Sequence, residues 1–408
     1  MPSTPVPPPV GPRAAAVLTL ELARDAGPKA GLLLDVAGGS AVLAAALDTL
    51  RPGDTLYLVP APGARPGVQA RLDLAGPGVA DRIRVVDSLA EVEPVDVAVL
   101  AEPVTGPAEA VRARLDEIGK YLRDGAVLAA AVPYGAGRTG GAAEELARQQ
   151  AVHGSGTDLV LRHLPPLLVH RLRFTPAPLS TVERLEPARR PSSVPLARGM
   201  NIDVSGVAAA GIMAGVAVAA RLTRRRSPLW LVPALAAVPV AAFFRDPHRE
   251  PPADPDAVVA ASDGRVLSVG HVSDPRFGGG EFLRVAVFLS VLDVHVNRAP
   301  VAGRVSDFFV VDGGFAPAMK AEAEHNVAAY TVLETDHGTV VVVQRTGLVA
   351  RRIVQRAPAG ALLARGERFG LIRFGSRTDV YLPAGAAEPV VAVGDRVAGG
   401  ATVIARWV

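Results

Sequence analysis

Residues 282–298 read FLRVAVFLSVLDVHVNR, a stretch that joins a β-strand pattern to a cluster of polar side chains. Its first part is an apolar run of strand length, and polar residues that include His295 follow it. Runs of similar length, punctuated by Gly, Pro and Asp, lie on both sides of it, at residues 258–260, 265–269, 305–311, 339–344, 379–382 and 401–407. Short apolar runs with turn residues between them are typical of β-strands. Residues 245–408 are therefore predicted to form a mainly-β domain.

The first part of the chain has a different pattern, in which helix-like stretches alternate with short apolar runs. These runs are residues 32–36, 55–59, 83–86, 95–100 and 126–132. Such alternation is typical of βαβ units, which form a parallel sheet covered by helices, with ligand space at the carboxyl ends of the strands. Residues 14–176 are therefore predicted to form an α/β Rossmann-like domain. The proline-rich residues 1–13 are expected to be a disordered leader, and residues 177–199, rich in Pro, Ser and Arg, a linker.

Two uncharged runs, residues 204–220 and 229–244, lie between the α/β and β regions, and arginines separate them. As a helix, each run would reach about 25 Å, less than the roughly 30 Å of a bilayer's hydrocarbon core. Residues 200–244 are therefore predicted to be a membrane-associated helical hairpin, and whether it crosses the bilayer stays open. The alternative is a hairpin buried in protein. The N-terminus lacks the basic start and apolar run of a secretory signal, so most of the chain is expected in the cytoplasm.

Composition limits the classes of function that need to be considered. With 408 residues, the chain is long enough for two or three cores. Its 43 Lys and Arg residues against 40 Asp and Glu residues leave a formal charge of only +3, which argues against a nucleic-acid partner. The absence of cysteine excludes disulfides, thiolate metal sites and cysteine nucleophiles, so any nucleophile is an oxygen or a nitrogen. No metal site is expected.

Three polar clusters interrupt the apolar runs of the β region, and together they supply an Asp, a His and a Ser. Asp263 lies in Ala261-Ser262-Asp263-Gly264, His295 in the cluster quoted above, and Ser376 in Arg373-Phe374-Gly375-Ser376-Arg377-Thr378-Asp379. An Asp that orients a His, which takes a proton from a Ser hydroxyl, activates that hydroxyl as a nucleophile. Each cluster also has a structural explanation as a turn, a core histidine or a loop dipeptide. Spacing alone leaves both interpretations open.

Four longer blocks in residues 243–408 resemble the short, bacterial and archaeal type of phosphatidylserine decarboxylase proenzyme. They are FFRDPHR at 243–249, FLS at 288–290 with DVHVNRAPVAG at 293–303, GLVARRIV at 347–354, and GERFGLIRFGSR at 366–377. The blocks occur in the order of that family. The resemblance therefore covers the whole region after the predicted hairpin.

This resemblance implies a self-cleaving proenzyme. The protein would cut the bond between Gly375 and Ser376, with His295 as base and Asp263 as its orienter, to give chains of residues 1–375 and 376–408. Ser376 would become a covalent pyruvoyl cofactor, which forms a Schiff base with the amine of phosphatidylserine and accepts the electrons released with CO₂. The product would be phosphatidylethanolamine. The implied setting is the cytoplasmic face of a bacterial cell membrane, with the lipid membrane and the protein's own two chains as partners, and homo-oligomerisation stays open.

The N-terminal half resembles a class I methyltransferase that depends on S-adenosylmethionine. Leu33-Leu34-Asp35-Val36-Ala37-Gly38-Gly39-Ser40 stands where that fold has its cofactor loop, but Ala37 and Ala41 occupy glycine positions. The second strand run is followed by no acidic residue to hold a ribose. A non-catalytic module is therefore expected. Two alternatives to a decarboxylase remain, a membrane-anchored methyltransferase and a non-catalytic scaffold with an unprocessed decarboxylase-like domain.

Overall fold

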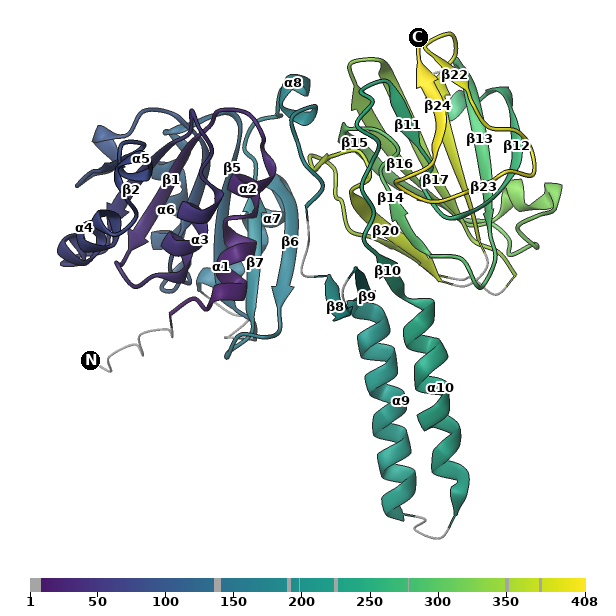
Figure 1. The fold of residues 1–408 in the computed structure, drawn as a ribbon, viewed down its shortest axis with the longest axis horizontal. Helices are drawn as coiled ribbons and strands as arrows, with labels where there is room; N and C mark the ends of the chain where they lie inside the picture. The colour runs from purple at the N-terminus through teal and green to yellow at the C-terminus, as the bar shows by residue number, and fades with distance from the viewer. Residues whose placement is uncertain are drawn as a thin grey trace. The chain divides into compact units, whose positions relative to one another are not determined.

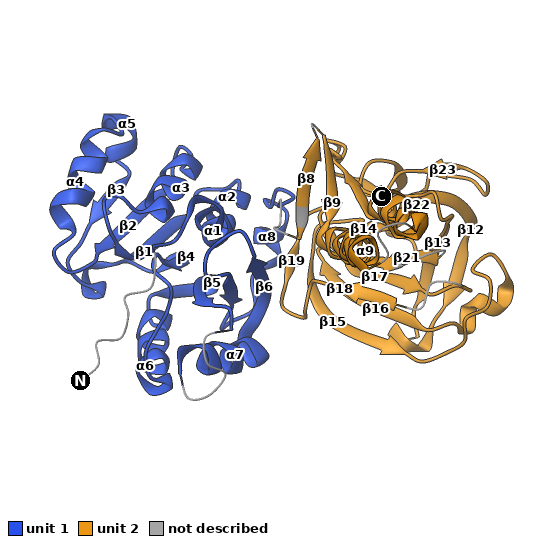
Figure 2. Cartoon of the chain, turned by 90° about the horizontal axis from the view of Figure 1, so that it is seen from below, with its two compact units in different colours: residues 1–191 blue, residues 192–408 orange. Residues whose placement is uncertain are grey.

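The computed structural model describes residues 9–135, 141–188, 192–197, 199–223, 227–277, 279–348, 352–373 and 376–408. The chain forms two compact units, residues 1–191 and residues 192–408 (Figure 1, Figure 2). Unit 1 is the α/β part of the chain. Unit 2 contains the helical hairpin and the β-rich region.

Unit 1 is built on a seven-stranded sheet with the order β3-β2-β1-β4-β5-β7-β6. Its strands are β1 (Ala30–Val36), β2 (Thr55–Pro60), β3 (Ile83–Val85), β4 (Val95–Leu100), β5 (Leu122–Pro133), β6 (Gly154–Val160) and β7 (Leu167–Leu172). The five predicted strands are present and pair in parallel. The sheet is nevertheless mixed, because β7 runs antiparallel to both β5 and β6. The short connection between β6 and β7 permits only an antiparallel pair.

Helices cover both faces of this sheet. One core contains side chains of α1 (Pro12–Leu18), α3 (Ala41–Thr49) and α4 (Arg65–Asp73), and the other contains side chains of α6 (Ala108–Gly119) and α7 (Ala142–His153). The short helices are α2 (Leu20–Arg24), α5 (Pro77–Ala80) and α8 (Leu179–Val182). This arrangement is the Rossmann-like architecture that the alternating pattern predicted.

Two segments expected to lack structure have some. In the expected leader, Val10 is buried in the core and α1 begins at Pro12, a residue that favours the first turn of a helix; residues 1–8 lie outside the described part. In the expected linker, Ala177 is buried, and α8 and strand β8 (Ser193–Ala197) form. Apolar residues among the prolines provide the buried contacts that composition did not reveal.

In its described residues, unit 2 contains an eight-stranded antiparallel sheet with the order β19-β15-β16-β17-β21-β13-β12-β23. Three three-stranded sheets accompany it: β14-β20-β18, β11-β24-β22 and, at the base of the hairpin, β10-β9-β8. The strands are β11 (Ala257–Val259), β12 (Gly264–Ser273), β13 (Glu281–Leu289), β14 (Val296–Arg298), β15 (Gly303–Val311), β16 (Ala328–Thr335), β17 (Gly338–Arg345), β18 (Arg352–Gln355), β19 (Leu362–Leu363), β20 (Arg368–Arg373), β21 (Ser376–Pro383), β22 (Ala387–Pro389), β23 (Arg396–Val397) and β24 (Val403–Trp407). The predicted mainly-β region is confirmed.

Both faces of the eight-stranded sheet are covered. Because side chains alternate along a strand, Val342 and Val380 face the main core, whereas Val343 and Tyr381 face a smaller aromatic core on the other side. The same alternation applies to Ser376, the first residue of β21. Ser376 is four positions before Val380, so its side chain is on the same face and points toward the main core.

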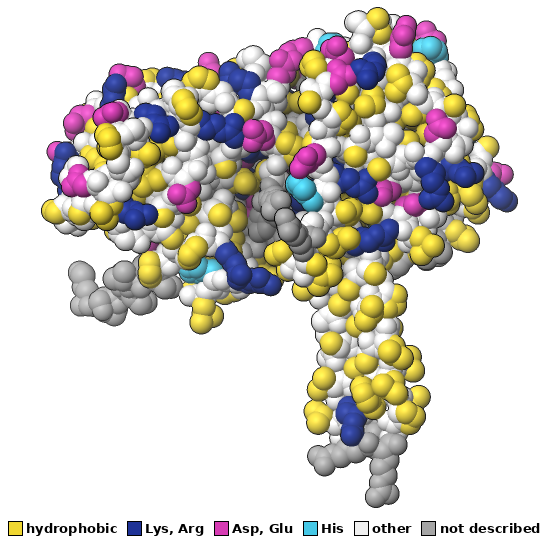
Figure 3. Space-filling model, in the orientation of Figure 1, with side chains coloured by type: hydrophobic (Ala, Val, Ile, Leu, Met, Phe, Trp, Pro, Cys, Tyr) yellow, Lys and Arg dark blue, Asp and Glu magenta, His cyan; other side chains and the backbone are white. Residues whose placement is uncertain are grey.

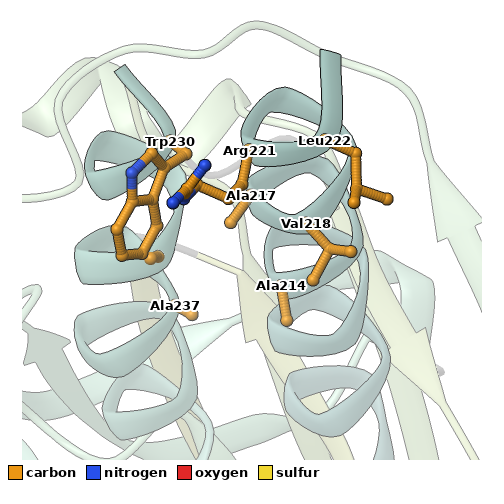
Figure 4. A pocket seen from close by; sticks show the side chains of 8 residues that line it. Ala214, Ala217, Val218, Arg221, Leu222, Trp230 and Ala237 are labelled. Carbon is orange, nitrogen blue, oxygen red and sulfur yellow. The ribbon is translucent and has the colours of Figure 1, made fainter. Parts of the chain in front are cut away.

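The hairpin consists of α9 (Val204–Thr223) and α10 (Leu231–Phe243), joined through a short 3₁₀ turn (Pro228–Trp230). Hydrophobic side chains cover most of its surface (Figure 3). Of the described residues, α9 alone is long and apolar enough to cross a membrane. It is longer than the uncharged run, because the helix continues through Arg221. Toward the tip, the two helices line an open pocket of about 370 Å³ beside Arg221 and Trp230 (Figure 4).

The base of the hairpin is part of unit 2. Strand β9 (Met200–Asp203) leads into α9 and pairs with β10 (Arg245–Pro247), which follows α10. The Asp203 carboxylate accepts the backbone N–H of Ser205 and forms a 2.7 Å ion pair with Arg356. Phe243 and Phe244 at the end of α10 pack with Leu371 of β20. The hairpin is thus fixed to the small sheet β14-β20-β18.

Candidate active site

Ser376 is the first residue of β21, in the middle of the eight-stranded sheet. It pairs with Leu289 at the end of β13, and its neighbour Arg377 pairs with Arg345 at the end of β17. The side chain points toward the main core and has no exposed surface. Among the described residues, no group forms a hydrogen bond with its Oγ. A buried polar atom without a partner lowers the stability of the folded state by about 1–3 kcal/mol. The burial of Ser376 in this state therefore requires an explanation.

His295 lies directly before β14, which pairs with β20. Its carbonyl oxygen accepts the backbone N–H of Ile372 at 3.2 Å, so it lies beside the end of β20, the strand that precedes β21 in sequence. Gly375, the predicted residue on the other side of the scissile bond, lies outside the described residues. The structure therefore places His295 beside the segment that leads into Ser376.

The protonation state of His295 follows from its surroundings. Nδ1 lies 2.9 Å from the carbonyl oxygen of Asp293, which can only accept, so Nδ1 carries the proton and Nε2 is the basic nitrogen. The ring centroid of Phe243 lies 4.2 Å from that of His295, and the histidine is 2% exposed. Burial lowers the pKa of His295 to about 4, against smaller opposing effects of Asp293 and Asp263. The imidazole is therefore neutral near pH 7 and able to accept a proton.

Asp263 lies between β11 and β12, and its carboxylate has two hydrogen-bond partners. Oδ2 accepts from Arg249 at 2.8 Å, and Oδ1 accepts the backbone N–H of Gly399 at 2.8 Å. Its negative charge raises the pKa of His295, which puts it within electrostatic range of the imidazole. The carbonyl of Asp293 also contacts the His295 ring, at Nδ1. The role of Asp263 as orienter stays a prediction.

The turn before His295 explains why the Asp293 carbonyl is well placed. The Asp293 carboxylate accepts both the N–H and the hydroxyl of Ser290, at 2.8 and 2.7 Å. This closes the turn that connects β13 to His295. A backbone acceptor has no signature in side-chain chemistry, although the Asp-x-His spacing in this turn is visible in the sequence.

Sequence reasoning also missed two buried polar residues, Asn297 of β14 and Gln344 of β17. Gln344 Nε2 donates to Asn297 Oδ1 at 2.7 Å, and both residues are fully buried. Asn297 Nδ2 and Gln344 Oε1 have no hydrogen-bond partner in the described part of the chain. Asn297 is two residues after His295 and shares its face of the strand. These two side chains therefore form a polar pair, close to His295 in sequence, within a largely apolar core.

An ionic network on the opposite face holds β21 in place. Arg377 donates to Asp379 at 2.6 Å and to Glu324 at 2.8 Å, and Arg345 donates to Asp379 at 2.9 Å. Burial alone would lower the pKa of Arg377, but Asp379 and Glu324 raise it above its ordinary value. A charged network that includes the residue after Ser376 restrains the start of β21. Among the described residues, no group of three or more His, Asp or Glu side chains is arranged to hold a metal ion.

In unit 1, helix α4 packs against residues 33–40, the segment that stands in the position of a cofactor loop. A Cβ on Gly38 would lie 2.2 Å from the carbonyl oxygen of Gly67, so the first turn of α4 packs directly on the loop. Asp35 has a left-handed φ of 59°, and its carboxylate pairs with Arg114. No acidic residue follows β2 before Asp73. These residues do not fit S-adenosylmethionine held by this loop.

Comparisons with known proteins identify a family for the C-terminal part of the chain. A family model described as phosphatidylserine decarboxylase matches residues 238–405. A phosphatidylserine decarboxylase proenzyme of Symbiobacterium thermophilum is 52% identical over 166 residues, which are 40% of this chain and 77% of the relative. One of Carboxydothermus hydrogenoformans is 44% identical over 165 residues, 40% of this chain and 78% of the relative.

Solved structures that are similar to part of the chain at low identity include methyltransferases. An O-methyltransferase of Bacillus cereus is 13% identical with a TM-score of 0.31, covering 40% of this chain and 82% of that protein. A SAM-dependent O-methyltransferase of Thermotoga maritima is 12% identical with a TM-score of 0.32, covering 41% of this chain and 68% of that protein.

Proposed function

Because the chain belongs to the phosphatidylserine decarboxylase family, a family of carboxy-lyases, we propose that unit 2 makes its own cofactor by cutting the bond between Gly375 and Ser376. The observation that carries this proposal is the buried Ser376 Oγ, which has no hydrogen-bond partner among the described residues. His295, which is neutral near pH 7, contacts the end of β20, the strand that precedes Ser376. A hydroxyl with no competing hydrogen bond is available to a neighbouring carbonyl. The residues therefore fit a pyruvoyl group derived from Ser376.

The proposed cleavage balances as follows. His295 Nε2 takes the proton of the Ser376 hydroxyl, Oγ bonds to the Gly375 carbonyl carbon, and the peptide C–N bond breaks to leave an ester and an amine. Loss of the Cα proton then expels the Gly375 carboxylate from Cβ. Water finally replaces the nitrogen at Cα, ammonia leaves, and a ketone remains at residue 376. The pyruvoyl carbonyl supplies the acceptor for the electron pair left when the substrate loses CO₂.

The structure supports retention of the short chain of residues 376–408 after cleavage. Strand β21 is hydrogen-bonded to β13 on one side and to β17 on the other, and β24 pairs with β11. The Arg377–Asp379 ion pair lies within this chain, while Arg345 and Glu324 belong to the long one. Both chains therefore contribute to the same sheet and network.

A membrane location at the cytoplasmic face of the bacterial cell membrane is part of this proposal. The exposed apolar surface of α9 and α10 and the lipid nature of the substrate support it. The contact between Phe243 at the end of α10 and His295 connects the hairpin directly to the reacting residues.

Denaturing electrophoresis and intact mass of the purified protein test the proposal. We expect two chains from the wild type, with a blocked N-terminus on the short one, and CO₂ release from phosphatidylserine. Ser376→Ala removes the nucleophile and is expected to give a single 42.1 kDa chain without activity. An uncleaved wild type, or a cleaved Ser376→Ala protein, would refute the mechanism and favour a non-catalytic scaffold.

A further inference from the structure

The end of the eight-stranded sheet at which Ser376 lies has an exposed apolar border. Strand β21 begins at this end, and its antiparallel neighbours β13 and β17 finish there, since Leu289 pairs with Ser376 and Arg345 pairs with Arg377. The segments that leave β13 and β17 therefore flank the start of β21. They carry Val291, Leu292 and Leu348, which we call the apolar rim.

The rim residues are exposed although they are large and apolar. Leu292 is 82% exposed, Leu348 63% and Val291 54%. A single exposed leucine is ordinary, but exposed apolar residues on both sides of a buried nucleophile are a candidate contact surface.

The hairpin joins the β-rich region at this same end of the sheet. Arg245, two residues after α10, donates a hydrogen bond to the carbonyl oxygen of Leu292. Phe243 lies against His295, three residues after Leu292. Arg352 is exposed in β18 and pairs with Arg373 at the end of β20. The rim is thus continuous with the base of the hairpin, and basic side chains accompany it.

We propose that the apolar rim docks on an anionic lipid surface, as a second membrane contact beside the hairpin. This inference rests on the proposed function, because the substrate must reach Ser376 from a bilayer. Leucine side chains enter the interfacial layer, and Arg side chains near an anionic surface are attracted to it. The contact brings the end of the sheet that holds Ser376 and His295 to the level of the lipid head groups.

Site-specific fluorescent probes test the contact directly, because the chain contains no cysteine. Leu292→Cys, Leu348→Cys and, as the control, Val408→Cys are labelled with an environment-sensitive dye in the full-length protein. Val408 is 79% exposed, and its N–H bonds to Ala386, just beyond the far end of β21. The proteins are placed in vesicles of phosphatidylcholine and phosphatidylglycerol.

We expect nitroxide-labelled lipid to quench the dyes at Leu292 and Leu348, and aqueous iodide to quench the dye at Val408. Equal iodide quenching at all three positions would overturn the proposal. Shielding of the rim dyes from both quenchers would also overturn it, because a protein surface or a second copy of the chain would then cover the rim.

An activity measurement separates docking from catalysis. Leu292→Asp and Leu348→Asp are compared with Val408→Asp on phosphatidylserine in vesicles and on a short-chain, monomeric phosphatidylserine. For each rim variant we expect complete self-cleavage, unchanged kcat/KM on the monomeric lipid, and a loss of about tenfold or more on vesicles. An equal loss on both substrates, or no loss on vesicles, would refute docking. If the wild type released no CO₂ from either lipid, the proposed function would fail, while the probes would still report the contact.

Discussion

The contact between Phe243 and His295 predicts that the end of α10 sets the pH range of self-cleavage. The phenyl ring lies 4.2 Å from the imidazole, centroid to centroid, and helps to keep it 2% exposed. Phe243→Ala admits water to this space, so the pKa of His295 should rise from about 4 toward its ordinary value. Arg245 opposes that rise, whereas Asp293 and Asp263 favour it.

The expected size follows from the fraction of neutral imidazole. At pH 5.5, about 97% of a histidine with a pKa of 4 is neutral, compared with about 9% of one that has returned to about 6.5. A base must be neutral to accept the Ser376 proton. Self-cleavage of Phe243→Ala should therefore be up to about tenfold slower than wild type at pH 5.5, beyond any loss that both proteins share at pH 8. The acid limb of the profile moves to higher pH.

The assay follows the short fragment by gel after cell-free synthesis into vesicles buffered at a series of pH values. Phe244→Ala is the matched control, because Phe244 belongs to the same buried cluster but packs on Gly206. Both variants lose a buried ring at a cost of about 3–5 kcal/mol, so a general loss of folding appears in both. An unchanged acid limb in folded Phe243→Ala, or the same displacement in both variants, would refute the reasoning.

Three further predictions concern His295 and Asp263, strand β21, and unit 1. His295→Ala and Asp263→Asn should each slow self-cleavage by orders of magnitude, and wild-type rates in both would require another base. Arg377→Met leaves Asp379 with less compensation for its buried charge and should lower the free energy of unfolding by about 3–5 kcal/mol, with partial recovery in Arg377→Lys, measured by urea denaturation. Calorimetry of the full-length protein with S-adenosylmethionine should show no binding, since α4 packs on Gly38; micromolar affinity would contradict this.

The sequence predicted the strands of unit 2 and the residues of its site for different reasons. Runs such as residues 282–289 alternate between two covered faces, so they are apolar on both faces, with Arg284 as the exception. Ser376 and His295 were singled out because polar residues interrupt such runs, and their predicted roles came from the family resemblance. The partner of His295 Nδ1 could not be found in this way, because it is the carbonyl of Asp293 and every residue has a carbonyl. In unit 1, β6 and β7 were not among the predicted strands, and apolar runs do not show strand direction, so the antiparallel pairing of β7 could not be predicted either.

Phe243 was quoted in a sequence block, yet nothing in that block indicates a contact with a histidine 52 positions later. The contact arises because α10 ends on the sheet β14-β20-β18. Each of the other blocks also reaches this part of unit 2, through the turn before His295, through Leu348 beyond β17, and through the end of β20 and the start of β21. The end of α10, the base, the nucleophile and the apolar rim thus come from four separate blocks that the antiparallel sheet brings together. The proposed function needs this arrangement, because the amine of the lipid head group must reach the carbonyl formed from Ser376 where the protein meets the bilayer.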